Sequence, residues 1–256
     1  MKLEFGSNDN ECEGDSSHGC EYCGKPLEPL GTIEFGEHFS ITTYGECDCE
    51  GYLEFLRAKQ RMEEAEAKRK LAERQLSSGI SRKFLQAEIS QRASARYLEG
   101  FADLNGEGLY IYGDVGTGKT YEASALAKAF IGAGYGVCLT TTIDMLDSIR
   151  GSYNDPFSKG IGYFSHIDIL ILDDLGKENA NSWAMTTMFQ VLDKRYGDLR
   201  PTIFTSQYPM SKLEERLSRS GERESARAIV SRIHETSEPL FLSRGDRRRE
   251  RRQGQS

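Results

Sequence analysis

The sequence predicts an α/β protein whose main domain is built around a mostly parallel β-sheet. From Leu109 to about Leu242, short apolar runs alternate with stretches of helix-forming residues, a pattern typical of strand–helix–strand units. A glycine-rich loop joins the first of these strands to the first helix. A chain of 256 residues is long enough for one domain of this kind and a small second one.

Composition and charge favour a globular protein of the cytoplasm. The longest apolar run, at residues 167–172, is far shorter than the roughly 20 residues that cross a bilayer, so no membrane partner is expected. The acidic N-terminus lacks the apolar centre of a signal peptide. The net charge of −7 is uneven, because residues 1–50 contain twelve acids and two bases, whereas residues 244–256 contain six arginines. We expect a disordered basic tail at 244–256. Because the net charge is negative, any contact with DNA must come from local basic patches.

Four cysteines lie in the acidic first segment, residues 1–51, which has few large apolar side chains. Cys20 and Cys23 form a C-x-x-C pair, and Cys47 and Cys49 form a C-x-C pair 23 residues later. In a reducing cytosol such pairs are more typical of metal sites than of disulfides, and four thiolates suit tetrahedral Zn²⁺. We therefore predict a small zinc-binding domain; free surface cysteines are the alternative. Three further residues are possible substitute ligands: Cys12, His18 and His38.

Helix formers almost without a breaker fill residues 52–77 and predict a charged connector helix. A weak heptad seam leaves a coiled coil as the alternative, because alternating steps of three and four join Phe55, Ala58, Met62, Ala65, Arg69, Ala72 and Leu76. The next residues, 78–106, are expected to be a helical lead-in to the main domain, which is assigned to 78–243.

The stretch "GLYIYGDVGTGKTYEASALAKAF" predicts a strand, a phosphate-binding loop and a helix. Gly113, Gly116, Gly118, Lys119 and Thr120 fit G-x-x-x-x-G-K-S/T. Glycines let the backbone turn tightly so that its N–H groups surround a phosphate, and the helix N-terminus adds partial positive charge. Lys119 is predicted to reach the β- and γ-phosphates of ATP, and Thr120 to ligate Mg²⁺. The remaining predicted nucleotide-binding residues are Asp114, Val115, Thr117 and Tyr121.

A second apolar strand, in "HIDILILDDLG", ends in two acids. Asp173 and Asp174 follow residues 167–172, at the carboxyl end of the strand, where open α/β sheets bind ligands. We predict that Asp173 holds Mg²⁺ and that Asp174 orients or deprotonates the attacking water. A glutamate is common at the second position; aspartate is one methylene shorter, so slow or conditional hydrolysis is expected.

A third strand, "RPTIFTSQY", ends in Thr205, Ser206 and Gln207. A polar side chain here can sense the γ-phosphate and hold the attacking water, and Gln207 or Ser206 is the candidate. An ordinary polar strand end is the alternative.

The last helical stretch, "ARAIVSRIHETSEPLFL", contains Arg227 and Arg232. Being five residues apart, they point in different directions on a helix. Arg232 is predicted to complete the active site of a neighbouring subunit as an arginine finger, with Arg227 as second choice, acting in trans or in cis. Surface ion pairs are the alternative for both.

The residues between the loop and the acidic strand mix basic and aromatic side chains, which together can track and stack single-stranded DNA. An ordinary surface loop is the alternative. The residues concerned are Arg150, Tyr153, Phe157, Lys159, Tyr163 and Phe164.

Taken together, "GLYIYGDVGTGKTY", "TTIDMLDSIRGSY", "ILILDDLGKENANSWAMTTMFQVLDKRY", "RPTIFTSQY" and "ARAIVSRI" resemble the DnaC-type and DnaI-type helicase loaders, a group that includes the IstB transposition helpers. The resemblance implies an AAA+ P-loop core with a central five-stranded parallel sheet and no large lid domain. It also implies ATP-dependent self-assembly on single-stranded DNA beside the replicative helicase hexamer. In the DnaI-like members a zinc-binding domain docks on the helicase, which gives residues 1–51 a partner-docking role.

Two residues depart from the loader pattern, because Gln207 stands where Asn is frequent and Asp174 where Glu is frequent. Three functions are therefore considered as alternatives. The first is a helicase loader with ATPase activity stimulated by single-stranded DNA. The second is an IstB-type ATPase that helps a transposase on duplex DNA, which "TSQ" favours. The third is a nucleotide-switched scaffold with little turnover.

Overall fold

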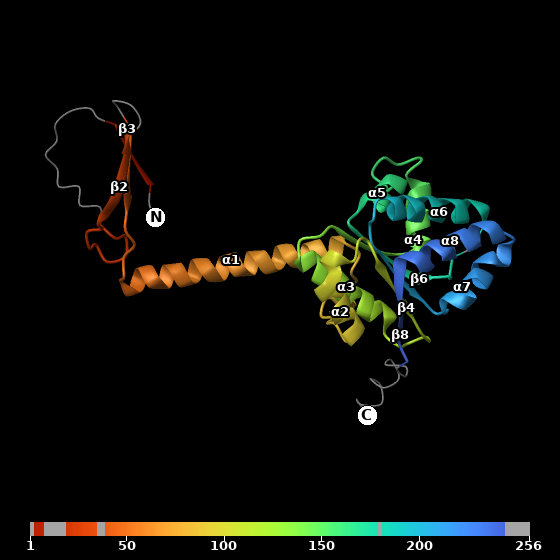
Figure 1. Cartoon of the computed structure of the whole chain (residues 1–256). Helices are drawn as coiled ribbons and strands as arrows, with labels where there is room; N and C mark the ends of the chain where they lie inside the picture. Colours follow the sequence, from red (N-terminus) through yellow and green to blue (C-terminus); the bar gives the residue numbers. More distant parts are fainter. Residues whose placement is uncertain (1–2, 8–18, 35–38, 179–180, 244–256) are drawn as a thin grey trace. The chain divides into compact units, whose positions relative to one another are not determined.

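The structure is a computed structural model that describes residues 3–7, 19–34, 39–178 and 181–243 (Figure 1). Backbone contacts divide the chain into unit 1, Met1–Lys70, and unit 2, Leu71–Ser256, and each unit is described by itself. The predicted basic tail and the substitute ligands Cys12, His18 and His38 lie outside the described residues.

Unit 1 contains a small antiparallel sheet that the sequence did not predict. The strands are β1 (Leu3–Ser7), β2 (Pro29–Glu34) and β3 (Phe39–Tyr44), with β3 in the centre. Pro29 begins the edge strand β2, where its missing N–H costs least, and the register shifts beside it. Among the side chains whose burial is described in this unit, only those of Cys20 and Cys47 are buried. Unit 1 therefore has no apolar core of ordinary size in its described part.

The predicted connector is confirmed as a helix, α1 (Glu50–Ser77). Most of its side chains are exposed, and i,i+4 contacts such as Glu66–Lys70 add local support. The helix ends before Gly79, whose φ of +95° is in the left-handed region. A Cβ atom at Gly79 would lie 1.8 Å from the Leu139 carbonyl oxygen, so glycine is required where the chain crosses the edge of the main sheet. The division between the units falls inside α1, and the domain boundaries at 51 and 77 remain predictions.

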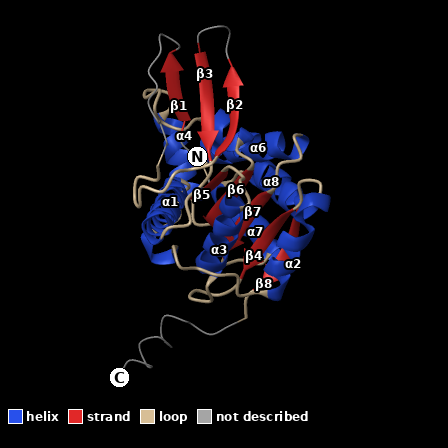
Figure 2. Ribbon diagram, turned by 90° about the vertical axis from the view of Figure 1, so that its left-hand side faces the viewer, coloured by secondary structure: helices blue, strands red, loops and turns tan. Residues whose placement is uncertain are grey.

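Unit 2 contains the expected five-stranded parallel sheet (Figure 2). Its strands are β4 (Gly108–Tyr112), β5 (Val137–Thr141), β6 (Ile169–Leu175), β7 (Thr202–Ser206) and β8 (Ser237–Phe241). Their order is β5-β6-β7-β4-β8, and each neighbouring pair is parallel. All carboxyl ends therefore meet at one edge of the sheet, where the phosphate loop and the acidic pair Asp173 and Asp174 lie.

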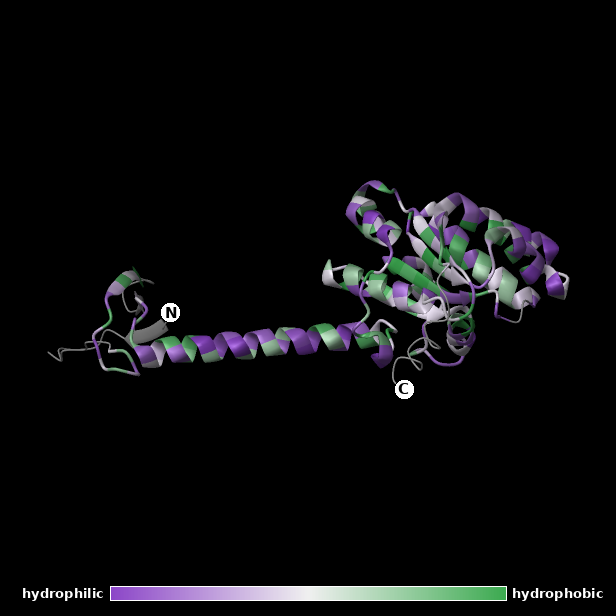
Figure 3. Ribbon diagram, turned by 90° about the horizontal axis from the view of Figure 1, so that it is seen from below, coloured by the Kyte–Doolittle hydropathy of each residue, from purple (hydrophilic) through white to green (hydrophobic). Residues whose placement is uncertain are grey.

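Helices cover both faces of this sheet. Along β6, Ile169 and Ile171 belong to one apolar cluster, and Leu170 and Leu172 belong to the other, as the two-residue period of a strand requires. In Figure 3 the hydrophobic colour is strongest on strand ribbon inside unit 2, whereas the surrounding helices alternate between hydrophobic and hydrophilic residues. The helices are α2 (Arg92–Gly100), α3 (Lys119–Gly132), α4 (Thr142–Gly151), α5 (Ile161–His166), α6 (Ser182–Gly197), α7 (Met210–Leu217) and α8 (Arg223–Thr236), with short 3-10 turns at η1 (Arg82–Phe84), η2 (Phe101–Asp103) and η3 (Ser218–Ser220).

Arg195, near the end of α6, is fully buried and was not singled out in the sequence. Its guanidinium donates to the carbonyl oxygens of Ile167 at 2.7 Å and Pro201 at 2.6 Å, and to Thr202 Oγ1 at 2.9 Å. Burial lowers the pKa of Arg195 to about 9. Because these acceptors precede or begin β6 and β7, one side chain ties α6 to the start of two central strands.

Candidate functional site

The phosphate loop, residues 113–120, joins β4 to α3 as predicted. Gly113 has a φ of +154°, and a Cβ atom there would lie 2.4 Å from the Leu242 carbonyl oxygen. Gly118, the residue before α3, has a φ of +99°, and no side chain caps the first turn of the helix. The N–H groups at this helix N-terminus are therefore available to an anion.

The Lys119 side chain folds back onto the start of the phosphate loop. Its Nζ atom donates to the carbonyl oxygens of Gly113 at 2.8 Å and Asp114 at 2.9 Å. Burial lowers the pKa of Lys119, opposed by the nearby carboxylates of Asp174 and Asp173. The side chain is thus held at the mouth of the loop, where it can turn toward a phosphate.

Thr120, Asp173 and Thr205 form one hydrogen-bonded group at the carboxyl edge of the sheet. Thr120 Oγ1 donates to Asp173 Oδ2 at 2.9 Å, and Thr205 Oγ1 donates to Asp173 Oδ1. Burial raises the pKa of Asp173, and the hydrogen bond from Thr205 opposes this shift. A hydroxyl and a carboxylate are oxygen ligands of the kind that Mg²⁺ prefers, so the pair Thr120 and Asp173 fits the predicted metal role.

Asp174 has an unusual backbone and a cationic neighbour. Its φ is +61°, rare for a residue with a side chain, and the pairing of β6 with β7 shifts register between Leu172 and Leu175. Asp174 N donates to Thr205 Oγ1 at 3.0 Å, which holds this turn. Its Oδ2 atom lies 2.8 Å from Lys177 Nζ, in an ion pair that the sequence analysis missed. Strained backbone of this kind is frequent at functional sites.

The end of β7 differs in detail from the expected arrangement. Ser206 is buried, donates to the Leu175 carbonyl oxygen at 2.8 Å and accepts from Tyr208 N at 3.1 Å, so its hydroxyl is occupied by backbone groups. Gln207 is partly exposed, and its side chain makes no hydrogen bond to the part of the chain that the structure describes. Of these three polar residues, Thr205 is the one that contacts the acidic pair.

The two predicted arginines both lie on α8 but differ in their surroundings. Arg232 Nε lies 3.1 Å from Asp193 Oδ1, and its guanidinium stacks on the Tyr196 ring at 4.4 Å. Arg227 is exposed and forms no ion pair within the described residues.

Arg232 lines an open cavity of about 630 Å³ together with Leu104, Tyr196 and Thr202. Thr202 begins β7, so this cavity lies at the amino edge of the sheet, opposite the phosphate loop. Arg232 is therefore not brought to the loop of its own chain.

Segment 88–91 lies against the first turn of α3, beside the phosphate loop. The Glu122 carboxylate, fully buried, accepts from Ser90 Oγ at 2.6 Å and from Gln91 N at 3.1 Å. Tyr121 Oη accepts from Glu88 N at 3.2 Å. This places the predicted residue Tyr121 next to the lead-in segment, a contact between distant residues that no local pattern revealed.

The basic and aromatic residues from the end of α4 to α5 separate into two groups. Phe157 is 94% exposed and Tyr153 is also exposed, whereas Phe164 is buried in the core and is not available to a ligand. Arg150 stacks on the Trp183 ring and Lys159 on the Tyr163 ring, each at 4.4 Å. The candidate DNA surface is thus smaller than expected.

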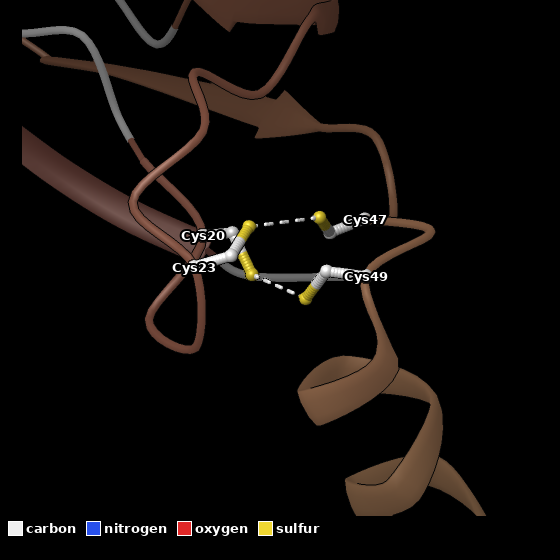
Figure 4. Close-up of side chains that lie close together, drawn as sticks. All are labelled: Cys20, Cys23, Cys47 and Cys49. Atoms are coloured by element: carbon white, nitrogen blue, oxygen red, sulfur yellow. Dashed lines mark hydrogen bonds between the residues drawn. The ribbon is translucent and has the colours of Figure 1, made fainter.

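The four predicted zinc ligands come together in unit 1 (Figure 4). The Sγ atoms of Cys20 and Cys49 are 3.7 Å apart, those of Cys23 and Cys47 are 3.5 Å apart, and all four lie within 4.8 Å of one another. Sulfurs placed tetrahedrally about 2.3 Å from zinc are about 3.8 Å apart, so this cysteine cluster fits Zn²⁺.

Backbone groups shape the cysteine cluster. Gly24, with a φ of +71°, closes the turn after Cys23, and its N–H donates to the Cys20 carbonyl oxygen at 2.8 Å. Burial raises the pKa of Cys20, but hydrogen bonds from the N–H groups of Tyr22 and Cys23 and from the thiols of Cys47 and Cys49 together lower it to about 7. Cys138, by contrast, is buried in β5.

Among the described helices, none combines the length and the apolar character needed to cross a lipid bilayer. Residues 54–256 match the family model described as IstB-like ATP binding protein. The replicative helicase loader DnaI of Bacillus subtilis is 25% identical over 260 residues, which covers 91% of this chain and 80% of that protein.

A shorter match is to the putative ATP-binding protein of insertion sequence IS1162 from Pseudomonas fluorescens, 35% identical over 104 residues, or 40% of this chain and 45% of that protein. The crystal structure of the DnaC helicase loader superposes with a TM-score of 0.53 at 23% identity, covering 64% of this chain and 100% of that one, and so shares the fold, an AAA+ P-loop core. The chain belongs to the family of IstB-like ATP-binding proteins.

Proposed function

We propose that this protein is an ATPase that loads the replicative DNA helicase onto single-stranded DNA. The observation that carries the proposal is the extent of the match to the helicase loader DnaI. At 91% of the chain, that match is too long to be confined to unit 2 and reaches into the cysteine-containing unit 1. The match to the insertion-sequence protein covers only 40% of the chain.

The ATPase chemistry is assigned to the residues around the phosphate loop. Bound Mg²⁺ neutralises charge on the β- and γ-phosphates of ATP. Thr120 and Asp173 hold the metal, Lys119 donates to the phosphates, and Asp174 orients the attacking water from the end of β6. Thr205 orients the Asp173 carboxylate through its hydrogen bond. We assign to Thr205 the polar role at the end of β7 that the sequence predicted for Gln207.

The position of the arginines supports self-assembly with ATP. Arg232 lies at the amino edge of the sheet, so it can complete only the site of another copy. Arg227, exposed on the same helix, is the second candidate. For single-stranded DNA, Phe157 and Tyr153 offer exposed rings, with Arg150 and Lys159 nearby in sequence.

Unit 1 is assigned to holding the helicase, with Zn²⁺ as its structural metal. Four thiolates in this geometry bind zinc in the reducing cytoplasm, where disulfides are rare. Binding of structural zinc supplies apparent free energies of about 10–16 kcal/mol, enough to fold a segment without an apolar core.

The second candidate is an ATPase that helps a transposase act on duplex DNA. The observations that favour it are the family model and the 35% identity to the insertion-sequence protein. The family model begins at residue 54, inside α1, so it leaves the strands and the cysteine cluster of unit 1 without a role.

The test is the native mass of the protein mixed with the replicative helicase of the same cell, with ATP and without. We expect a complex with several copies per helicase hexamer, and ATP turnover that rises with single-stranded DNA. The Lys119→Ala variant is the control for turnover. No complex in either nucleotide state, with zinc and ATP still bound, would instead favour the transposase helper, and duplex DNA would be the next ligand.

A further inference from the structure

Three aromatic side chains of unit 1 form a half-exposed group beside the cysteine cluster. The ring centroids of Tyr22 and Phe55 are 5.5 Å apart, those of Tyr22 and Tyr52 are 6.1 Å apart, and those of Tyr52 and Phe55 are 6.3 Å apart. Tyr22 is 46% exposed and Phe55 is 44% exposed. We call these three residues the aromatic triad. Aromatic rings exposed to this degree in a group are typical of contact surfaces rather than of a closed core.

The triad is held rigidly by the elements that carry it. Tyr22 lies inside the turn between Cys20 and Cys23, and Tyr52 N donates to Cys49 Sγ at 3.4 Å. A Cβ atom at Gly51 would lie 2.9 Å from the Tyr22 Cβ atom, so the glycine lets α1 approach this turn closely. Rings fixed in this way lose little conformational entropy when a partner covers them.

The segment that leads up to Phe55 is acidic. Between residues 46 and 54 there are four acids and no base, and all four are exposed: Glu46, Asp48, Glu50 and Glu54. Asp48 Oδ1 lies 3.9 Å from Lys25 Nζ, and both side chains are exposed. An ion pair of this kind contributes little stabilisation and leaves the rim acidic. An apolar centre with an acidic rim is complementary to an apolar surface with a basic rim.

We propose that the aromatic triad is the anchor with which unit 1 binds its protein partner, and that the partner presents an apolar pocket bordered by Lys or Arg side chains. This inference rests on the proposed function, in which the partner is the replicative helicase hexamer. Aromatic residues at the centre of an interface are often the ones that carry its affinity. Nucleic acid is a poor ligand for the aromatic triad, because the acidic rim repels phosphates.

The experiment measures the Kd of the full-length protein for the helicase hexamer of the same cell, for three variants. Tyr22→Ser and Phe55→Ser remove rings of the triad. Met62→Ser is the matched control, because Met62 is an apolar residue of α1 that is 74% exposed and outside the triad. We expect both triad variants to weaken binding at least tenfold and the control less than twofold, with ATP turnover unchanged in all three. One zinc per chain in each variant establishes that the cysteine cluster is intact.

A second pair of variants tests the charge of the rim. Glu54→Lys places a cation beside Phe55, whereas Glu63→Lys makes the same change elsewhere on α1. We expect the first to weaken binding severalfold, with a smaller dependence of Kd on salt, and the second to have no effect.

The outcomes separate two failures. If the wild-type protein forms no complex with the helicase, the proposed function is wrong and this inference falls with it. If the wild-type protein binds but Phe55→Ser and Tyr22→Ser bind equally well with zinc retained, only the triad is wrong. A loss of affinity for a single-stranded or duplex oligonucleotide in the triad variants, with helicase binding unchanged, would also overturn the inference in favour of a nucleic-acid surface.

Discussion

Asp174 stands at the point where the end of β6 departs from regular strand geometry. Its left-handed backbone turns the carboxylate toward Lys177, three residues later, and the turn is closed by a hydrogen bond from Lys177 N to the Asp174 carbonyl oxygen at 3.2 Å. A carboxylate oxygen that is held in an ion pair at 2.8 Å is not free to turn toward a water molecule. Lys177 therefore restrains the residue that we assign to the attacking water.

Replacement of this cation should raise basal ATP turnover. In the Lys177→Met variant the aliphatic stem remains and the charge is lost, so we expect turnover without DNA or partner to rise severalfold at an unchanged Kd for ATP. Lys177→Arg is the matched control and should behave like the wild-type protein. Steady-state phosphate release is the measurement. A fall in turnover in the Met variant would show that Lys177 assists the reaction instead.

Thr205 is expected to matter more for turnover than its neighbours at the end of β7. Thr205→Val keeps the shape of the side chain but removes the hydroxyl that holds both Asp173 and the Asp174 N–H group. We expect turnover to fall about tenfold or more, the size of effect that misplacement of reacting groups produces. Thr205→Ser should retain most of the activity. Gln207→Ala should lower turnover less than Thr205→Val does. A larger loss in Gln207→Ala than in Thr205→Val would show that Gln207 holds the attacking water, as the sequence predicted.

Residue types and spacing were enough to predict the phosphate loop, the acidic pair and the four cysteines, because each is a local pattern with a fixed chemical purpose. They were not enough to choose among Thr205, Ser206 and Gln207. Which of these three successive side chains faces Asp173 and Asp174 depends on how β6 and β7 are paired. The register shift after Leu172 that sets this pairing has no local signal in the sequence. The partner of Asp174 was missed because an i,i+3 pair in a turn looks like an ordinary charged loop.

At the scale of an element, α6 is held to the sheet by a buried cation. Arg195→Met should destabilise the protein by about 3 kcal/mol or more, because the Ile167 and Pro201 carbonyl oxygens would lose a donor in a place that water does not reach. Lys194→Met is the control: its exposed pair with Asp198 should contribute less than about 1 kcal/mol. Denaturant unfolding of the two variants measures the difference. Equal midpoints would mean that the carbonyl groups find other donors.

The strands β4, β6 and β7 of unit 2 were readable from the sequence, since continuous apolar runs followed by helices are what a parallel sheet requires. The strands of unit 1 were not. Their segments are short, and the runs "GTIE" and "FSITTY" in β2 and β3 have β-branched residues but few large apolar ones. A strand that belongs to a three-stranded sheet beside the cysteine cluster needs less apolar character than one that is buried on both faces.

At the scale of the whole molecule, the two units should respond differently to removal of metal. In the Cys23→Ser, Cys47→Ser double variant, or after treatment with a strong zinc chelator, we expect loss of the one zinc per chain and of the near-ultraviolet signal of the aromatic triad. The Kd for ATP should stay within about twofold of its starting value, because the cysteine cluster lies in unit 1 and the phosphate loop in unit 2. Metal analysis and nucleotide titration of the same samples measure both. A parallel loss of ATP binding would contradict this independence.

The strand order of unit 2 has a consequence for the protein while it is being made. Both neighbours of β4 come late in the chain: β7 begins at Thr202 and β8 at Ser237, and the Leu242 N–H group donates to the Tyr112 carbonyl oxygen at 2.8 Å. At a synthesis rate of about 5–20 residues per second, the strand before the phosphate loop leaves the ribosome several seconds before either neighbour exists. A nascent or truncated chain therefore has an unpaired central strand and an unsupported loop. The strand pairing that supports the phosphate loop therefore forms only after β7 and β8 have been translated.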